Sequence, residues 1–313
     1  MAPPGPQSGS PPNTPPDTPP GTSKRQRRVK QSKFEHGLIR PVFRAAFRTL
    51  EGGLKITGLH ARGRRNAADT RLSRFDIALA DLPAAFDGYT ILHMSDLHAD
   101  GPIDLEASVG RVLDGIEADL CVLTGDYRYR LSGRHEDAAA PMARIVKHVR
   151  TRDGIFGIMG NHDLGTMIAP LEAAGIRMLV NDHVILRRGG DEVQLVGLDD
   201  VHAYQPAEEA AAALAAMPGG FRILLQHSPE LLDEADAANV SLYLCGHTHG
   251  GQICLPGGIP VMTNIRTHRR YARGLWRHGD MTGYTTSGVG VSVMPLRFFC
   301  RGEVALITLR RAS

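Results

Sequence analysis

Five apolar runs of strand length in this chain are each followed, within three residues, by aspartate, asparagine or histidine. The clearest case is LCGHTHGG, in which a short apolar run leads into His247 and His249 between glycines. Short apolar runs that alternate with helical segments favour buried parallel strands in a layered α/β fold. Because ligands bind outside the carboxyl ends of parallel strands, we expect the five polar segments to meet at one site.

Each of the five apolar runs has its own polar residues at its carboxyl end. The polar residues are Asp96 and His98 after YTILHM, Asp126 after LCVL, Asn161, His162 and Asp163 after GIFGIM, His227 after FRILLQ, and His247 and His249 after SLYLC. Helical spacing predicts helices over 104–117, 135–150, 207–217 and 228–238, and further strands are predicted at 74–79, 176–180, 184–187, 193–197, 283–287 and 303–310.

This set of residues offers oxygen and nitrogen donors, which suit Mn, Fe, Zn or similar divalent ions. Seven donors are too many for one tetrahedral site but fit two ions that share a bridging carboxylate, the usual device for in-line attack on phosphorus. The i, i+2 spacing of Asp96 with His98, and of His247 with His249, predicts that each pair projects from one side of an extended backbone. The glycines beside them predict tight turns and close approach to the metals.

Each motif has a structural alternative when taken alone. A lone Asp-x-His or Gly-Asp is common in proteins, and His227 after a strand is also typical of a hydrogen-bonded core histidine. All five motifs, in order and at strand ends, favour a metal site.

The five motifs resemble those of the calcineurin-like metallophosphoesterases, over about residues 72–310. The segments LPAAFDGYTILHMSDLH, LQHSPE, CGHTHGGQICLP and GVGVSVMPLRFFCRGEVALITL are similar to the bacterial subfamily of twin-arginine-exported phosphoesterases and hydrolases of UDP-2,3-diacylglucosamine. The resemblance implies a four-layer α/β sandwich, two mixed sheets flanked by helices, over 72–313. It also implies a dimetal phosphoesterase that cleaves a phosphodiester or pyrophosphate bond, such as that of a lipid-linked nucleotide, through a hydroxide bridging the ions.

The resemblance further implies a role for each site residue. The first ion would be held by Asp96, His98, Asp126 and His249, and the second by Asp126, Asn161, His227 and His247, with Mn favoured over Fe, Zn or Mg. His162 would face the phosphate and protonate the leaving oxygen, and Asp163 would orient His162. Arg297 would contact substrate, the alternative being a turn arginine.

One departure from the family pattern lies after Asp126. Many members have Gly-Asp-x-x-Asp in this motif, but here Tyr129 replaces the second Asp, which supports the metal site rather than binding metal. The arginine signature of Ser/Thr protein phosphatases is also missing, which disfavours protein dephosphorylation.

The N-terminal region differs in composition from the rest of the chain. Residues 1–65 hold thirteen Lys/Arg and three Asp/Glu, and nine prolines fall in residues 1–23. We therefore predict a disordered Pro-rich and basic arm over 1–33 and an amphipathic helix with a linker over 34–71. The basic helical region 24–51 would either lie on an anionic membrane or pack on the catalytic body; nucleic acid is a less favoured partner.

The sequence predicts a cytoplasmic protein, with peripheral attachment to the inner membrane as an extension of that prediction. No apolar run is long enough to span a bilayer, and the twin arginine Arg64-Arg65 lacks a following apolar segment, so we interpret it as a charge pair in a loop. The four cysteines lack CxxC spacing and are expected to be buried thiols. The competing functions are a nuclease or cyclic-nucleotide phosphodiesterase, and a non-catalytic scaffold.

Overall fold

The computed structural model describes residues 52–130 and 136–312. The predicted arm over 1–33 and the basic helical region 24–51 lie outside the described residues. Within the described part, no helix is both long and apolar enough to cross a membrane.

Two six-stranded mixed sheets form the centre of the molecule. The first has the order β1-β14-β2-β3-β4-β5 and the second the order β12-β13-β9-β8-β7-β6; a small hairpin, β10-β11, lies apart from both. The strands are β1 Thr70–Leu79, β2 Thr90–Met94, β3 Leu120–Leu123, β4 Ile155–Gly157, β5 Ile176–Met178, β6 Asp182–Arg188, β7 Asp191–Gly197, β8 Arg222–Leu225, β9 Leu242–Cys245, β10 Cys254–Leu255, β11 Ile259–Pro260, β12 Gly274–His278, β13 Met281–Thr285 and β14 Gly302–Arg311.

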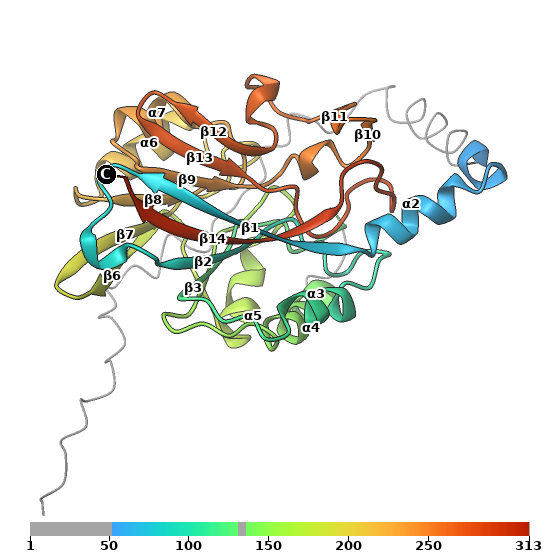
Figure 1. Cartoon of the computed structure of the whole chain (residues 1–313), viewed down its shortest axis with the longest axis horizontal. Helices are drawn as coiled ribbons and strands as arrows, with labels where there is room; N and C mark the ends of the chain where they lie inside the picture. The colour runs from blue at the N-terminus through green and yellow to red at the C-terminus, as the bar shows by residue number, and fades with distance from the viewer. Residues whose placement is uncertain (1–51, 131–135, 313) are drawn as a thin grey trace, which may run out of the picture.

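Helices cover the outer face of each sheet (Figure 1). The helices are α2 Leu59–Ala67, α3 Glu106–Leu113, α4 Glu136–Val146, α5 Ile168–Ala173, α6 Ala207–Ala215 and α7 Leu232–Ala237, with 3₁₀ turns η1 Ala84–Phe86, η2 Gly165–Met167, η3 His249–Gly251 and η4 Arg269–Tyr271. Helices α3 to α5 pack on the first sheet, and α6 and α7 pack on the second. The predicted four-layer sandwich is confirmed.

The alternation of side chains along the strands explains the layers. In β3, Leu120 and Val122 enter the core between the two sheets, whereas Cys121 and Leu123 face the helices. All four residues are fully buried because both faces of the strand are covered, so the strand reads as a continuous apolar run rather than an alternating one. The four cysteines are free thiols and buried, as predicted.

The segment before β1 differs from its prediction. Gly52 and Gly53 are helical, and the twin arginine Arg64-Arg65 lies in helix α2 rather than in the predicted loop. Tertiary packing explains the helix: a Cβ on Gly63 would lie 2.9 Å from the ring of Phe298, so that ring packs directly against the helix backbone.

Candidate metal centre

The polar segments that follow five of the strands converge at one place, beside the carboxyl ends of these strands in both sheets. Strands β2, β3 and β4 belong to the first sheet, and β8 and β9 to the second. Three groups of side chains have donor atoms close enough to hold an ion: Asp96, His98 and His249; His98, Asp126 and His162; and Asp126, His227 and His247. The predicted convergence is therefore observed, and it uses strands from both sheets.

The backbone reaches this arrangement through left-handed turns. Asp96, His98, Asp126, His247 and His249 have φ values of 52°, 44°, 55°, 69° and 50°. The prediction of an extended backbone within each i, i+2 pair is therefore wrong. The strands have already ended, and the chain must turn sharply to bring side chains from different strands together, which left-handed residues permit at a cost in backbone strain.

Glycines allow these turns to approach one another, as predicted. A Cβ on Gly160 would collide with the carboxylate of Asp126, and one on Gly246 would collide with that of Asp96. Alanine at either position would therefore displace the neighbouring carboxylate, that of Asp126 or of Asp96.

Three imidazoles are oriented by backbone carbonyls outside the centre. His98 Nδ1 bonds to the Arg128 carbonyl, His227 Nδ1 lies 2.7 Å from the Thr124 carbonyl, and His247 Nε2 lies 2.9 Å from the Asn264 carbonyl. A carbonyl accepts but never donates, so each of these nitrogens carries the proton. When such a ring is neutral, the form that binds metal, its opposite nitrogen points a lone pair into the centre.

Inside the centre, acceptor atoms face one another. His227 Nε2 lies 3.2 Å from His247 Nδ1, 3.0 Å from Asn161 Oδ1 and 3.4 Å from Asp126 Oδ2. Burial by itself would lower the pKa of His227, yet the carboxylate of Asp126 raises that pKa well above its ordinary value. The carboxylate thus favours a positive charge at this position, and the donor set fits a divalent metal.

A second group of donors lies on the other side of Asp126. His98 Nε2 is 3.2 Å from His249 Nε2, and the latter is 3.5 Å from Asp96 Oδ1. Asp126 Oδ2 is 3.8 Å from His98 Nε2, so the same oxygen faces both groups. This placement is the one that a carboxylate bridging two ions requires.

Burial favours the neutral form of the imidazoles in this second group. Desolvation lowers the pKa of His98 to about 3, and it lowers the pKa of His249 well below its ordinary value. Neutral imidazole is the form that binds metal, so these rings need not lose a proton first.

Metal binding should weaken as the pH falls below about 6. Burial raises the pKa of Asp96 to about 6, so its carboxyl group is protonated below that pH and must release the proton before it can bind metal. One displaced proton gives up to about tenfold weaker binding per pH unit. Titration calorimetry on both sides of pH 6, in two buffers of different ionisation enthalpy, measures both the affinity and the proton release; a pH-independent affinity would contradict the expectation.

His162 lies at the centre but is more accessible than the donors around it. Its side chain is 13% exposed, against 0% for His98 and His227. Nδ1 lies 3.0 Å from the Tyr129 carbonyl, and Nε2 lies 3.9 Å from Asp126 Oδ2. Tyr129 thus supports the site through its backbone.

Asp163 shapes the loop of Asp126 instead of orienting His162. Its buried carboxylate accepts hydrogen bonds from the backbone amides of Asp126 at 2.8 Å, Tyr127 at 2.9 Å, Arg128 at 3.2 Å and Gly160 at 2.8 Å. The ring of His162 takes its orientation from a backbone carbonyl, so the role predicted for Asp163 is corrected to positioning the Asp126 turn.

Arg297 is fully buried, which corrects the prediction that it contacts substrate. Its guanidinium donates to the carbonyls of Ser287 at 2.8 Å, Gly288 at 3.1 Å and His249 at 3.3 Å, and further to those of Gly290 and Arg301. The arginine ties the turn of His249 to the segment after β13, so it positions one of the candidate metal donors.

Arg297→Met should lower the free energy of unfolding by about 3 kcal/mol, because several buried carbonyls would lose their donor at once. Urea denaturation measures this difference. Arg310→Met is the matched control, since Arg310 forms an exposed ion pair with Asp76 that is worth about 1 kcal/mol or less. Equal losses for the two variants would contradict the assignment.

A neighbouring polar group was not identified from the sequence. The ring of His202 lies 4.3 Å from that of His247, and its Nδ1 is 3.1 Å from a carboxylate oxygen of Glu230, which also accepts from the amide of Arg266 at 2.9 Å. Glu230 stands in the LQHSPE segment, but nothing in its local pattern indicates this contact.

The fold and this donor set define a metal-binding phosphoester hydrolase. The model of the family described as calcineurin-like phosphoesterase matches residues 89–251, about half of the chain. The chain therefore belongs to the calcineurin-like phosphoesterase family, and it is a hydrolase.

Relatives support this assignment over a longer stretch. The chain is 31% identical to the uncharacterized metallophosphoesterase YkuE of Bacillus subtilis over 241 residues, 74% of this chain and 82% of the relative. It is 32% identical to phosphodiesterase YaeI of Escherichia coli over 234 residues, 71% of this chain and 82% of the relative. Among solved structures, the NAD nucleotidase NadN of Haemophilus influenzae aligns with a TM-score of 0.40 at 15% identity, over 64% of this chain and 45% of that chain.

Proposed function

We propose that the chain hydrolyses a phosphodiester or pyrophosphate bond with two divalent ions, for which manganese is the favoured metal. The observation that carries this proposal is the cluster of mutually facing acceptors around Asp126, with the accessible His162 beside it. The name of the Escherichia coli relative supports a phosphodiester as the substrate class.

The residues divide into two sets of donors around Asp126. One ion would be held by Asp96, His98, Asp126 and His249, and the other by Asp126, Asn161, His227 and His247. When bound, such a pair supplies Lewis acidity and lowers the pKa of water. The backbone carbonyls of Thr124, Arg128 and Asn264 keep the donor nitrogens pointed inward.

His162 would act as the general acid. Donation from Nδ1 to the Tyr129 carbonyl fixes the ring and leaves Nε2 directed toward the centre. A proton at Nε2 can pass to the leaving oxygen as the ester bond breaks. Its greater exposure fits a group that meets substrate rather than metal.

A narrower substrate follows from the sequence resemblance alone: a lipid-linked pyrophosphate such as UDP-2,3-diacylglucosamine. The basic segment 24–51 would then hold a cytoplasmic protein at the inner membrane. The alternative with the same chemistry is a nuclease or cyclic-nucleotide phosphodiesterase, for which activity on nucleic acid would fall steeply with salt.

The test is hydrolysis by the Mn²⁺-loaded full chain. The substrates are bis-p-nitrophenyl phosphate, UDP-2,3-diacylglucosamine, a cyclic nucleotide and single-stranded DNA at low and high salt. Turnover of the aryl diester supports dimetal phosphodiester chemistry, and the other three substrates decide its natural class. A metal-loaded chain that turns over none of the four would overturn the proposal in favour of a non-catalytic scaffold.

A further inference from the structure

Large apolar side chains are exposed mainly at one end of the molecule. Among the described residues, nine such side chains are strongly exposed, and all except Leu275 come from the helical segment up to α2, the β10-β11 hairpin with the residues after it, or the loop 291–300. We call these three segments the apolar end. Its exposed residues are Ile56, Leu59, Leu255, Ile259, Val261, Met262, Val293 and Phe299.

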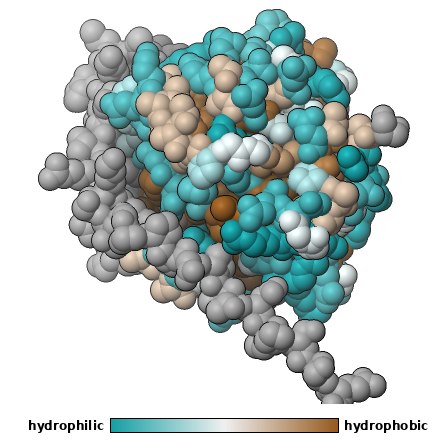
Figure 2. All heavy atoms as spheres, turned by 90° about the vertical axis from the view of Figure 1, so that its left-hand side faces the viewer, coloured by the Kyte–Doolittle hydropathy of each residue, from teal (hydrophilic) through white to brown (hydrophobic). Residues whose placement is uncertain are grey.

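The three segments form one continuous surface. Phe298 packs against Gly63 of α2, and the carbonyl of the same residue accepts a hydrogen bond of 2.9 Å from the amide of Cys254 in the hairpin. Figure 1 shows α2, β10 and β11 at the same end of the two sheets. The opposite end, which Figure 2 shows, is largely hydrophilic where it is coloured.

Two of the exposed residues are held in strained backbone. Val293 and Phe299 have φ values of 61° and 52°, and their side chains are 65% and 55% exposed. A β-branched residue such as valine is rarely found in the left-handed region. Strain of this kind tends to occur at functional sites, so the strained backbone and exposed side chains of these two residues indicate a functional surface.

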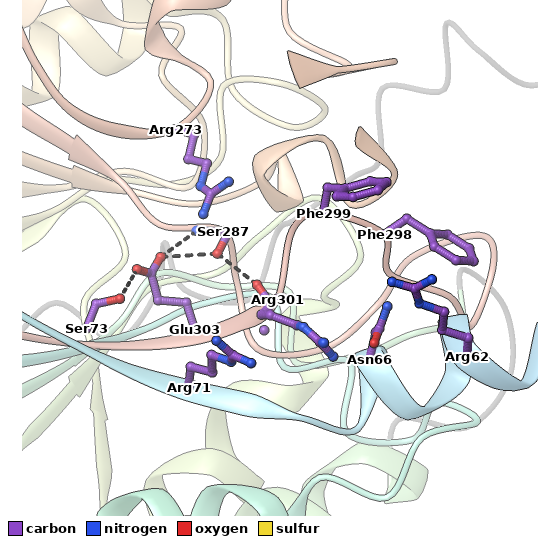
Figure 3. Close-up of a pocket in the computed structure, with 11 residues that line it drawn as sticks. Arg62, Asn66, Arg71, Ser73, Arg273, Ser287, Phe298, Phe299, Arg301 and Glu303 are labelled. Atoms are coloured by element: carbon purple, nitrogen blue, oxygen red, sulfur yellow. Dashed lines mark hydrogen bonds between the residues drawn. The ribbon is translucent and has the colours of Figure 1, made fainter. Parts of the chain in front are cut away.

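A cavity of about 380 Å³ borders the apolar end, between α2, the start of β1 and residues 298–303 (Figure 3). Four arginines line it, namely Arg62, Arg71, Arg273 and Arg301, together with the rings of Phe298 and Phe299. This volume is within the range of small-molecule sites.

The arginines are only partly neutralised by the described part of the chain. Arg71 and Arg301 share Asp69, at 3.4 Å and 3.3 Å, whereas Arg62 and Arg273 form no ion pair with a described residue. Glu303 also lines the cavity, but its carboxylate accepts hydrogen bonds from neutral donors on Ser73, Thr286 and Ser287. The cavity therefore has an excess of positive charge beside apolar side chains.

We propose that the apolar end docks on an anionic membrane, with the phosphate of a phospholipid headgroup in the arginine-lined cavity. Guanidinium groups match phosphate oxygens in charge and geometry. The exposed apolar side chains would enter the acyl boundary, which a free phosphate ligand would not require. This inference uses residues that are separate from the metal donors, and it does not depend on the substrate proposed above.

The experiment is vesicle co-sedimentation of the full chain, with phosphatidylglycerol in phosphatidylcholine compared with phosphatidylcholine alone. Arg62→Gln/Arg273→Gln tests the cavity, and Phe299→Asn tests the apolar rim, since asparagine tolerates positive φ. Arg277→Gln and Leu275→Asn are matched controls on β12; Leu275 is 56% exposed and belongs to none of the three segments of the apolar end.

We expect the test variants to weaken binding to anionic vesicles about tenfold and the controls to leave it within about twofold. Hydrolysis of bis-p-nitrophenyl phosphate in solution, or the melting temperature if no turnover is found, should match the parent and so exclude misfolding. Vesicle binding that is absent in the parent, or unchanged in the test variants, overturns the proposal. Binding of soluble glycerol phosphate to the cavity without any binding to vesicles would also overturn it and assign the cavity to a soluble phosphate.

Discussion

Asp126→Asn should lower phosphodiester hydrolysis by about 10³-fold or more and reduce the amount of metal that co-purifies with the chain. The Oδ2 atom of Asp126 faces His227 and His98 at 3.4 Å and 3.8 Å, so one carboxylate serves both groups of donors. The substitution removes the negative charge that would bridge the ions, and metal-derived stabilisation of a transition state is worth several kcal/mol. Steady-state kinetics and elemental analysis of the purified variant measure the two effects.

The asparagine variant is chosen because it leaves the fold of the turn intact. Asp126 has a φ of 55°, which asparagine adopts readily, and Oδ1 can still accept the hydrogen bond from the amide of His162. Asp233→Asn is the control, because the Asp233 side chain is 91% exposed and forms an ion pair with His278 at the surface. Full activity and full metal content in Asp126→Asn would contradict the bridging role.

His162→Asn should lower the turnover rate by about 10²- to 10⁴-fold while leaving the metal content unchanged. The asparagine amide can replace the donation of Nδ1 to the Tyr129 carbonyl, but it has no proton to give to a leaving oxygen. Separate measurement of kcat and of bound metal therefore distinguishes a general acid from a metal donor.

A substrate with a good leaving group sharpens this second test. Protonation matters less for p-nitrophenolate than for an alkoxide, so the deficit of His162→Asn should shrink on the aryl substrate. His183→Asn on β6 is the matched control and should match the parent. Loss of metal together with activity in His162→Asn would assign His162 to the metal centre instead.

The layered fold and the candidate metal donors were predictable because each buried strand appears in the sequence as an apolar run, and the site residues follow the ends of these runs. A strand covered on both faces, such as β3, reads as an uninterrupted apolar run, and Asp126 follows three residues after its end. The same logic applies to His227 after β8 and His247 after β9. Hairpin β10-β11 and helix α2 were not predicted, because each is too short to give a clear periodic pattern. Helix α2 is stabilised by packing against Phe298, a residue distant in sequence.

Roles that depend on contacts distant in sequence could not be predicted. Arg297 looks like a surface arginine in its own segment, yet it lies beneath His249, 48 residues earlier in the chain. Asp163 stands next to His162 but serves the amides of the Asp126 turn. The gathering of Arg62 with Arg273 around one cavity likewise has no local signal.

The sequence by itself determined the order of the five apolar strands that lead into the site, the candidate metal donors after them and the glycines between them, because hydrophobic periodicity and residue chemistry are local properties. Only the tertiary structure decided which nitrogen of each histidine faces the centre, that the donor turns are left-handed, and that Arg297 is buried. Those features depend on which backbone carbonyls and side chains from other strands come within hydrogen-bond distance, and the fold alone establishes these distances.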